Sequence, residues 1–452
     1  MTGLFGTDGI RGVANRELTP DLALALARAA GLVLVSDGGE VVIGRDTRLS
    51  GQMLEAALIA GLCSAGADVR LAGIIPTPGV AWLTVDQQAS AGAMISASHN
   101  PVADNGIKFF SDEGLKTSSE VELAIEDCMR SFEGRLPEGS GIGVVRRLDD
   151  AHDRYMHHLL SSLEGTRLAG LRIVLDCAFG AAWELAPATF REAGAHCVAI
   201  NAEPDGARIN VGCGSTDMAG LAQRVRAERA DLGLAFDGDA DRVLAVDERG
   251  EVVDGDRIIG MSAISMRVRD RLRNNLVVAT VMSNLGFLRA LEHRGIEVIT
   301  APVGDKFVAD AMGQAGASLG GEQSGHVIFA DYATTGDGIL TGLQIARSLV
   351  DSGERLSVLA DFFEPFPQVL VNVEVDSRDA LAGAEPIWDE VRATEERLGP
   401  DGRVLVRASG TEHLVRVMVE ASDAATANHA AHALAEVVAR ELGASADHTR
   451  AP

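Results

Sequence analysis

The feature that most constrains the fold is an order of strands and helices that occurs three times along the chain. In each copy a short apolar strand leads into a helical stretch, a second strand and a third strand. The copies begin at Val41, Arg172 and Leu276. Strands that alternate with helices are typical of α/β units with largely parallel sheets. The sequence therefore predicts three topologically similar mixed α/β domains, although the copies share little sequence identity.

The third strand of each copy runs into a polar loop. These loops are Ser96–Asn100, Asp237–Arg242 and Gly321–His326. Open α/β sheets bind ligands at the carboxyl ends of their strands. We therefore expect the three loops to face one central cleft.

The last part of the chain follows another pattern, after a break at Glu364–Pro367. A strand at Val369–Val375 precedes a helix near Pro386–Leu398, and two strands around residues 407–411 precede a helix at about Ala424–Leu442. This order predicts a smaller C-terminal α+β domain with an antiparallel pair. The predicted domains span residues 1–148, 149–250, 251–366 and 367–452.

The charge balance excludes one class of partner. The chain has 40 basic and 65 acidic residues and a formal net charge of −25, whereas a nucleic-acid partner requires a basic surface. No signal-peptide pattern opens the sequence, and its apolar runs are too short to span a bilayer. We expect a cytoplasmic protein without nucleic-acid or membrane partners, whose five cysteines are reduced, mostly buried thiols.

Three carboxylates alternate at Asp237, Asp239 and Asp241, directly after a predicted strand. Unpaired, they would repel one another, so a cation is their natural partner, and oxygen ligands suit Mg²⁺ or Ca²⁺. Three protein ligands leave room for a substrate oxygen. Two alternatives stay open: an EF-hand loop, although Arg242 stands where that loop requires glycine, and a solvated acidic turn without metal.

Ser98 follows the third strand of the first copy, beside His99. A serine next to a histidine is a candidate nucleophile with a nearby base, although a turn-forming serine fits the local sequence equally well. We interpret Asp104–Lys108 as a tight turn that brings Lys108 back to the strand end. There Lys108 can neutralise a phosphate, or act as a general acid or base if its pKa is lowered.

Other segments carry groups suited to a phosphorylated sugar. Arg407–Thr411 combines a guanidinium, two hydroxyls and a glycine, and Arg416 on the next strand can return to the same anion. Gly321–His326 offers a carboxylate and a hydroxyl for sugar hydroxyls. Arg11, in a glycine-rich turn at residues 6–12, can lie near a phosphate. Each segment alone also fits an ordinary polar turn.

Together, and in this order, these segments resemble the signatures of one family, the α-D-phosphohexomutases, over nearly the whole chain. The resemblance implies a cleft enclosed by four domains and a role for each motif residue. The residues implied to serve catalysis are Ser98, Arg242, His99, Lys108 and Arg11. Those implied to bind the metal are Ser98, Asp237, Asp239 and Asp241. Those implied to bind the substrate are Glu322, Ser324, Gly304, Asp305, His326, Arg407, Ser409, Gly410, Thr411 and Arg416.

The activity that the resemblance implies is a mutase that interconverts glucosamine 6-phosphate and glucosamine 1-phosphate through a phosphoserine, feeding amino-sugar nucleotide and cell-wall synthesis. The implied cofactors are Mg²⁺ and, as activator, glucosamine 1,6-bisphosphate or a similar sugar bisphosphate. The implied partners are the small phosphosugar and a second copy in a homodimer. Gln323 weakly disfavours glucose and mannose phosphates. Intact Ser98, the aspartate triad and Arg242 disfavour a catalytically silent phosphosugar-binding protein. A Ca²⁺-binding module stays open, and a metal titration would separate it from Mg²⁺ use.

Overall fold

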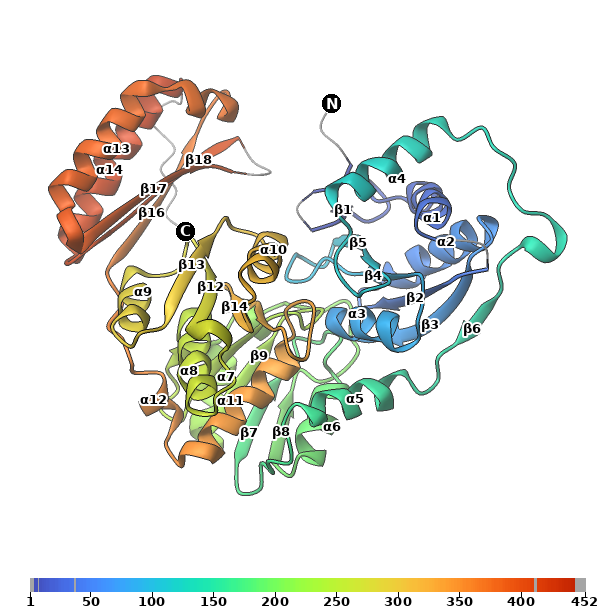
Figure 1. The fold of residues 1–452 in the computed structure, drawn as a ribbon, viewed down its shortest axis with the longest axis horizontal. Coiled ribbons are helices and arrows are strands. Elements are labelled where there is room, and N and C mark those ends of the chain that lie inside the picture. Colours follow the sequence, from blue (N-terminus) through green and yellow to red (C-terminus); the bar gives the residue numbers. More distant parts are fainter. Residues whose placement is uncertain (1–3, 7, 36–37, 410–412, 444–452) are drawn as a thin grey trace. The chain divides into compact units, whose positions relative to one another are not determined.

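The computed structural model describes residues 4–6, 8–35, 38–409 and 413–443. The chain divides into two compact units (Figure 1). The first comprises Met1–Thr280 and Glu297–Phe362, and the second comprises Val281–Ile296 and Phe363–Pro452. The second unit is therefore discontinuous in sequence, because it includes a helix from the middle of the chain, α9 (Leu285–Glu292).

The first repeat forms a sheet with the strand order β1-β5-β4-β2-β3-β6. Helices α1, α2 and α4 share one apolar core with this sheet, whereas Val80 of α3 lies beside Gly44 and Gly92 in the sheet. The strands are β1 (Ile10–Val13), β2 (Glu40–Arg45), β3 (Asp68–Ile74), β4 (Ala91–Ile95), β5 (Asp104–Ser111) and β6 (Val145–Arg147). The helices are α1 (Pro20–Leu34), α2 (Gly51–Ser64), α3 (Thr77–Asp86) and α4 (Ser119–Ser131).

The second and third repeats form sheets with the orders β11-β10-β9-β7-β8 and β13-β12-β14-β15. The strands of the second are β7 (Arg172–Asp176), β8 (His196–Ile200), β9 (Leu232–Phe236), β10 (Val243–Asp247) and β11 (Val252–Val253). Those of the third are β12 (Leu276–Thr280), β13 (Glu297–Ala301), β14 (Leu319–Gly321) and β15 (Val327–Phe329). The helices of this region are α5 (Ala151–Ser161), α6 (Leu185–Glu192), α7 (Ala219–Glu228), α8 (Gly255–Val268), α10 (Asp305–Ala315), α11 (Gly338–Ser352) and α12 (Leu356–Leu359).

The strand pairing confirms the predicted repeat. In each copy a central strand (β2, β7 or β12) runs parallel to both of its neighbours. One of these neighbours then pairs antiparallel with the next strand, in the hairpins β4–β5, β9–β10 and β14–β15. The polar segments of Ser98, Asp237 and Glu322 form the loops of these hairpins. Each segment therefore lies at the carboxyl end of a strand, where ligands bind.

Two local interpretations of the sequence are wrong. Asp104–Lys108 is no turn, because β5 begins at Asp104 and places Lys108 opposite Met94 of β4. The Asn105-Gly106 pair, which usually marks a turn, lies inside the strand and pairs with β1. Glycine fits at 106 because a Cβ there would lie 2.5 Å from the carbonyl oxygen of Ser96. Arg11 lies on strand β1 and not in a turn, since β1 pairs antiparallel with β5.

The second unit has a sheet of the order β16-β18-β17, in which every pairing is antiparallel. The predicted antiparallel pair is thus confirmed as β17 and β18, and the strand predicted at Val369–Val375 joins it as β16. Helices α13 and α14 pack their apolar residues onto this sheet. Gly410, Thr411 and the C-terminal tail from residue 444 lie outside the described residues. The elements are β16 (Gln368–Glu374), α13 (Glu385–Leu398), β17 (Gly402–Ala408), β18 (Leu414–Ala421) and α14 (Ala424–Leu442).

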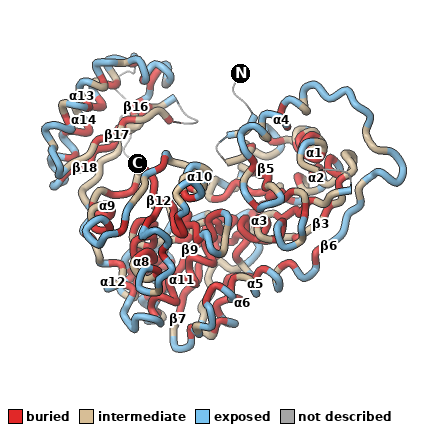
Figure 2. Tube along the Cα trace, in the orientation of Figure 1, coloured by how far each residue is buried: buried red, intermediate tan, exposed pale blue. Residues whose placement is uncertain are grey.

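Burial follows the sheets, and Figure 2 shows the central strands of the first unit almost entirely buried. The five cysteines are free thiols, as expected. Only Cys177 and Cys213 are fully buried, so the prediction that most of the thiols are buried is wrong. None of the helices in the described part of the chain combines the length and apolar character needed to cross a bilayer.

Candidate functional site

The loop between β4 and β5 holds Ser98, which is almost completely buried. Its hydroxyl donates to Oδ2 of Asp237 at 2.5 Å, across 139 residues of sequence. Nδ1 of His99 lies 3.2 Å from the same hydroxyl. The φ of Ser98 is +52°, in the left-handed region that residues other than glycine rarely adopt. The candidate nucleophile and the aspartate triad therefore meet directly.

The three aspartates of the β9–β10 loop are buried, and an oxygen of each lies within 4.8 Å of the others. Oδ1 of Asp239 and Oδ1 of Asp241 are buried without a hydrogen-bond partner among the described residues. Buried acceptors without partners are costly, and a cation would satisfy both. The cluster can therefore bind a metal ion. The EF-hand alternative is wrong, because β10 begins at Val243 and occupies the positions that the calcium loop needs.

The electrostatics of the triad also favour a cation. Burial, with the charges of Asp241 and Asp239, raises the pKa of Asp237 well above its usual range. Burial likewise acts to raise the pKa of Asp241, but Lys108 and His326 hold this pKa well below its usual value. Neighbouring carboxylates resist carrying their full charge together, and a divalent ion would remove that resistance.

Lys108 projects into the triad from β5. Its Nζ lies 3.1 Å from Oδ2 of Asp239, 3.1 Å from Oδ2 of Asp8 and 3.7 Å from Oδ2 of Asp241. Burial acts to lower the pKa of Lys108, but these carboxylates outweigh it and raise the pKa well above the usual value. Beside the triad, Lys108 therefore carries a positive charge that can neutralise a phosphate, and its role as a general acid or base stays a prediction.

His99 has the opposite character. Burial, reinforced by Arg242 and Arg11, lowers the pKa of His99 to about 4. The ring is therefore neutral near pH 7, and its nitrogen beside Ser98 can accept a proton. Arg11 lies in the same region, where Nη1 donates to Oδ1 of Asn100 at 3.0 Å.

Two charged residues of this network escaped the sequence analysis. Asp8 forms ion pairs with Arg11, Lys108 and Lys116. Lys116 also pairs with Asp305 at the start of α10, so it links the first repeat to the third. The only signal for Lys116 was the scarcity of lysine in this chain, because side-chain meetings across 189 residues leave no local pattern.

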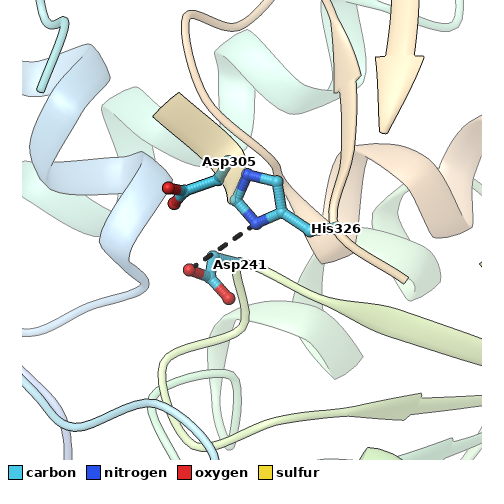
Figure 3. A group of neighbouring side chains, drawn as sticks. All are labelled: Asp241, Asp305 and His326. Atoms are coloured by element: carbon cyan, nitrogen blue, oxygen red, sulfur yellow. Dashed lines mark ion pairs between the residues drawn. The ribbon is translucent and has the colours of Figure 1, made fainter. Parts of the chain in front are cut away.

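His326, Asp305 and Asp241 form a second cluster of potential metal ligands (Figure 3). Nε2 of His326 accepts the backbone N–H of Gly336 at 3.0 Å, so the proton of the neutral ring lies on Nδ1, which faces Oδ2 of Asp241 at 3.7 Å. Asp305 already pairs with Lys116. A protonated ring nitrogen and a neutralised carboxylate fit an ion-pair network better than a second metal ion.

The β14–β15 loop places the predicted sugar-binding residues close together. Oε1 of Glu322 accepts the backbone N–H of Gly304 at 3.0 Å, and Oε2 lies 3.5 Å from the hydroxyl of Ser324. Arg242 and His326 form an isolated antiparallel β-bridge. The Nε of Arg242 lies 3.9 Å from Oδ1 of Asp241. A cavity of about 640 Å³ lies between residues 115–120 and the helix α10, with Lys116, Asp305, Lys306 and Thr334 among its lining residues.

Thr77 is a further residue that the sequence analysis missed. Its hydroxyl donates to Oδ2 of Asp239 at 2.6 Å, and its backbone N–H donates to the carbonyl of Asp239 at 2.9 Å. Thr77 begins α3 and is fully buried. A Thr-Pro step at the start of a helix is common, so the sequence gives no sign that this threonine orients a metal ligand.

The predicted phosphate-binding residues of the C-terminal domain lie in the second unit. Arg407 of β17 stands directly opposite Arg416 of β18. Burial and the neighbouring charge of Arg416 lower the pKa of Arg407. Like charges opposite each other on paired strands are destabilising, and an anion between them would relieve the repulsion. Ser409 is buried at the end of β17, where its N–H donates to the carbonyl of Leu414 at 2.8 Å.

Family models of phosphoglucomutase/phosphomannomutase match four segments of the chain. The alpha/beta/alpha domains I, II and III match residues 2–134, 153–250 and 254–366, and the C-terminal domain matches residues 370–437. The phosphoglucosamine mutase of Rhodococcus opacus (strain B4) is 53% identical over 444 residues, which cover 97% of this chain and 100% of that protein.

Solved structures share the fold. A phosphoglucomutase/phosphomannomutase family protein from Burkholderia thailandensis matches with a TM-score of 0.83 at 26% identity, covering 98% of both chains. The N-acetylphosphoglucosamine mutase of Aspergillus fumigatus, solved with GlcNAc-6P and magnesium, matches with a TM-score of 0.69 at 18% identity, covering 97% of this chain and 96% of that chain. The family models span most of this chain, and the Rhodococcus relative spans nearly all of it, so the chain belongs to the phosphoglucomutase/phosphomannomutase family, the α-D-phosphohexomutases.

Proposed function

We propose that this chain is a phosphoglucosamine mutase, an isomerase that interconverts glucosamine 6-phosphate and glucosamine 1-phosphate. The observation that carries the proposal is the buried hydroxyl of Ser98, 2.5 Å from Asp237 in a triad that can bind a metal ion. A phosphoryl group on Ser98 would place its charge beside that ion. The name of the Rhodococcus relative, at 53% identity, supports the choice of sugar.

In the proposed reaction a bond forms between O1 of glucosamine 6-phosphate and the phosphorus on Ser98, the bond from phosphorus to Oγ breaks, and the proton of the O1 hydroxyl replaces the phosphoryl group on Oγ. The bisphosphate then turns over in the cleft. In the second transfer Oγ takes the phosphoryl group from O6 and gives its proton to O6, which leaves glucosamine 1-phosphate. A Mg²⁺ ion held by Asp237, Asp239 and Asp241 would supply charge neutralisation for the transferring group. His99, whose ring is neutral near pH 7, lies 3.2 Å from the hydroxyl of Ser98 and is assigned to the reacting end of the cleft.

The fixed cations of this chain supply the remaining stabilisation. Lys108, Arg11 and Arg242 place positive charge around the triad, which suits a transfer whose catalysis is mostly positioning and electrostatics. Glu322 and Ser324 are assigned to sugar hydroxyls, with Gly304, Asp305 and His326 beside them. Arg407, Ser409, Gly410, Thr411 and Arg416 are assigned to the phosphate that is not reacting.

Four further assignments belong to this function. The cofactors are Mg²⁺ and a sugar 1,6-bisphosphate that primes Ser98, and the enzyme acts in the cytoplasm as a homodimer. The domains we assign span residues 1–148, 149–250, 251–366 and 367–452.

A coupled assay on glucosamine 6-phosphate, glucose 1-phosphate and mannose 1-phosphate, with Mg²⁺ and a bisphosphate primer, tests the proposal. We expect the highest kcat/KM for glucosamine 6-phosphate and loss of all turnover in Ser98→Ala. Ser131→Ala, which removes an exposed hydroxyl of α4, is the matched control and should keep full activity. Higher kcat/KM with glucose or mannose phosphate would favour the alternative mutases. Absence of turnover with any of the three would favour a silent phosphosugar-binding protein.

A further inference from the structure

The side chain of Arg48 is completely buried beneath the Ser98 loop, and all of its N–H donors are used. Nη1 donates to the carbonyls of Pro101 at 2.6 Å and Asp104 at 2.9 Å. Nη2 donates to the carbonyls of Ser98 at 2.9 Å and Asn100 at 2.8 Å. Nε donates to Oδ2 of Asp46 at 3.0 Å. A guanidinium carries five N–H donors in a planar fork, and each of them has an acceptor here.

Asp46 connects Arg48 to the backbone N–H of Ser98 through the hydroxyl of Ser96. Its Oδ2 also accepts the hydroxyl of Ser96 at 2.7 Å, and that hydroxyl in turn accepts the backbone N–H of Ser98 at 2.9 Å. Both backbone polar groups of Ser98 are therefore tied to the Arg48–Asp46 pair, the carbonyl directly and the N–H through Ser96. The pair is buried and mutually neutral, so it adds no net charge beside the aspartate triad.

The conformation that this pair supports is a strained one. Ser98 has a φ of +52°, in the left-handed region that strains a residue with a side chain. The carbonyl of Ser98 also packs closely against Gly238 in the β9–β10 loop of the aspartate triad. A Cβ on Gly238 would lie 2.5 Å from the carbonyl oxygen of Ser98. Without external restraint the loop would relax toward commoner backbone angles and move the Oγ of Ser98 away from Asp237.

We propose that Arg48 is a positioning residue for phosphoryl transfer, which holds the Ser98 loop in its strained conformation and keeps the Oγ of Ser98 at the aspartate triad. This role rests on the proposed phosphoserine chemistry. Arg48 touches neither the Ser98 hydroxyl nor the sugar-binding loop and acts through four backbone carbonyls. Lysine cannot replace it, because an ammonium has three donors without the planar fork.

Arg48→Lys tests this role by steady-state and single-turnover kinetics. We expect kcat to fall roughly 10- to 100-fold, since small misplacements of reacting groups cost that much. KM for glucosamine 6-phosphate should stay within about twofold of wild type, because the sugar-binding residues lie on other loops. The rate at which glucose 1,6-bisphosphate phosphorylates Ser98 should fall by the same factor as kcat. A general loss of structure would instead lower the active fraction and leave the rate per active site unchanged.

The matched control is Arg70→Lys on β3 of the same sheet, which changes an ion pair with Glu40 of β2 and should keep wild-type kinetics. If Arg48→Lys does not fold, Asn210→Ala decides the question, because Nδ2 of Asn210 also donates to the carbonyl of Ser98 at 2.9 Å. It should lower kcat roughly 3- to 10-fold at unchanged KM.

A wild-type kcat in folded Arg48→Lys, or in Asn210→Ala where the lysine variant is unfolded, would overturn the positioning role. A rise in KM without a fall in kcat would overturn it as well. Failure of the proposed function looks different, because the wild-type enzyme itself would then show neither turnover nor phosphorylation of Ser98.

Discussion

At the scale of single residues, the site is built from buried charges that neutralise one another. Lys108 faces Asp8, Asp239 and Asp241 within 3.7 Å, and the pKa of Lys108 is raised as a result. Two triad oxygens nevertheless lack a hydrogen-bond partner within the described chain. The fixed lysine therefore offsets part of the negative charge and leaves the remainder for a metal ion.

Thr77→Val isolates one contact that orients a metal ligand. The change removes the hydroxyl that donates to Oδ2 of Asp239 at 2.6 Å and nearly preserves the side-chain shape. Groups that orient metal ligands typically contribute 10- to 100-fold to metal affinity, so we expect the Mg²⁺ concentration for half-maximal activity to rise by about tenfold. Thr84→Val, on the same helix and equally buried, is the control. Equal Mg²⁺ dependence in both variants would refute the role of Thr77.

At the scale of elements, the start of α11 packs against the β9–β10 loop, which carries the aspartate triad. Oδ1 of Asp337 caps this helix by accepting the N–H of Leu340 at 2.9 Å, and the hydroxyl of Tyr155 donates to the same carboxylate. The next residue, Gly338, donates its N–H to the carbonyl of Ala240 at 2.9 Å. Because a Cβ at 338 would lie 2.5 Å from the carbonyl of Arg242, glycine is needed for this close approach.

Asp337→Asn tests the electrostatics of this element. Burial raises the pKa of Asp337 to about 6. The folded state therefore favours the protonated form of Asp337. The stability that this preference contributes is fully present below the pKa of Asp337 in the unfolded chain, and it is lost as the pH rises through about 6. Asparagine keeps the cap without the charge. We expect the stability of the variant relative to wild type to increase between about pH 4 and 6, by on the order of 2–3 kcal/mol, and then to level off. Urea midpoints across this range measure the difference, and a constant difference would contradict the raised pKa.

The sequence predicted the elements better than the contacts between them. Strand–helix periodicity and the positions of the polar loops predicted three repeats with Ser98, Asp237 and Glu322 at strand ends, because both signals are local. The interpretation of Asn105-Gly106 as a turn is wrong, because the pairing of β5 with β1 depends on segments nearly a hundred residues apart. Arg48 and Thr77 were missed for the same reason, because their roles arise from acceptors that only the fold brings to them.

At the scale of the whole molecule, the chain separates its predicted tasks between two units. The first contains Ser98, the aspartate triad and the sugar-binding loop, and the second contains Arg407 and Arg416. The second unit also takes α9 from the third repeat. There Leu285 donates its N–H toward the buried carboxylate of Glu420 at 3.3 Å. The second unit is thus stabilised by its own packing and by a helix from the middle of the chain.

Arg407→Gln tests the task of the second unit. We expect KM for glucosamine 6-phosphate to rise by roughly tenfold or more, because a charge-assisted fork to the phosphate is lost. Thermal stability without substrate should stay unchanged or increase, since the repulsion between Arg407 and Arg416 is removed. Arg392→Gln, on the exposed face of α13, is the control. An unchanged KM would exclude Arg407 from phosphate binding.

Intact-mass spectrometry detects the transfer of a phosphoryl group through Ser98 on the protein itself. Incubation with glucose 1,6-bisphosphate and Mg²⁺ should add about 80 Da to the wild-type chain, the mass of one phosphoryl group. Addition of excess glucosamine 6-phosphate should then exchange the phosphoryl group for one from the sugar, which isotopic labelling reveals. Ser98→Ala should gain no mass. A chain that turns over substrate without this modification, or that carries it on another residue, would contradict the account.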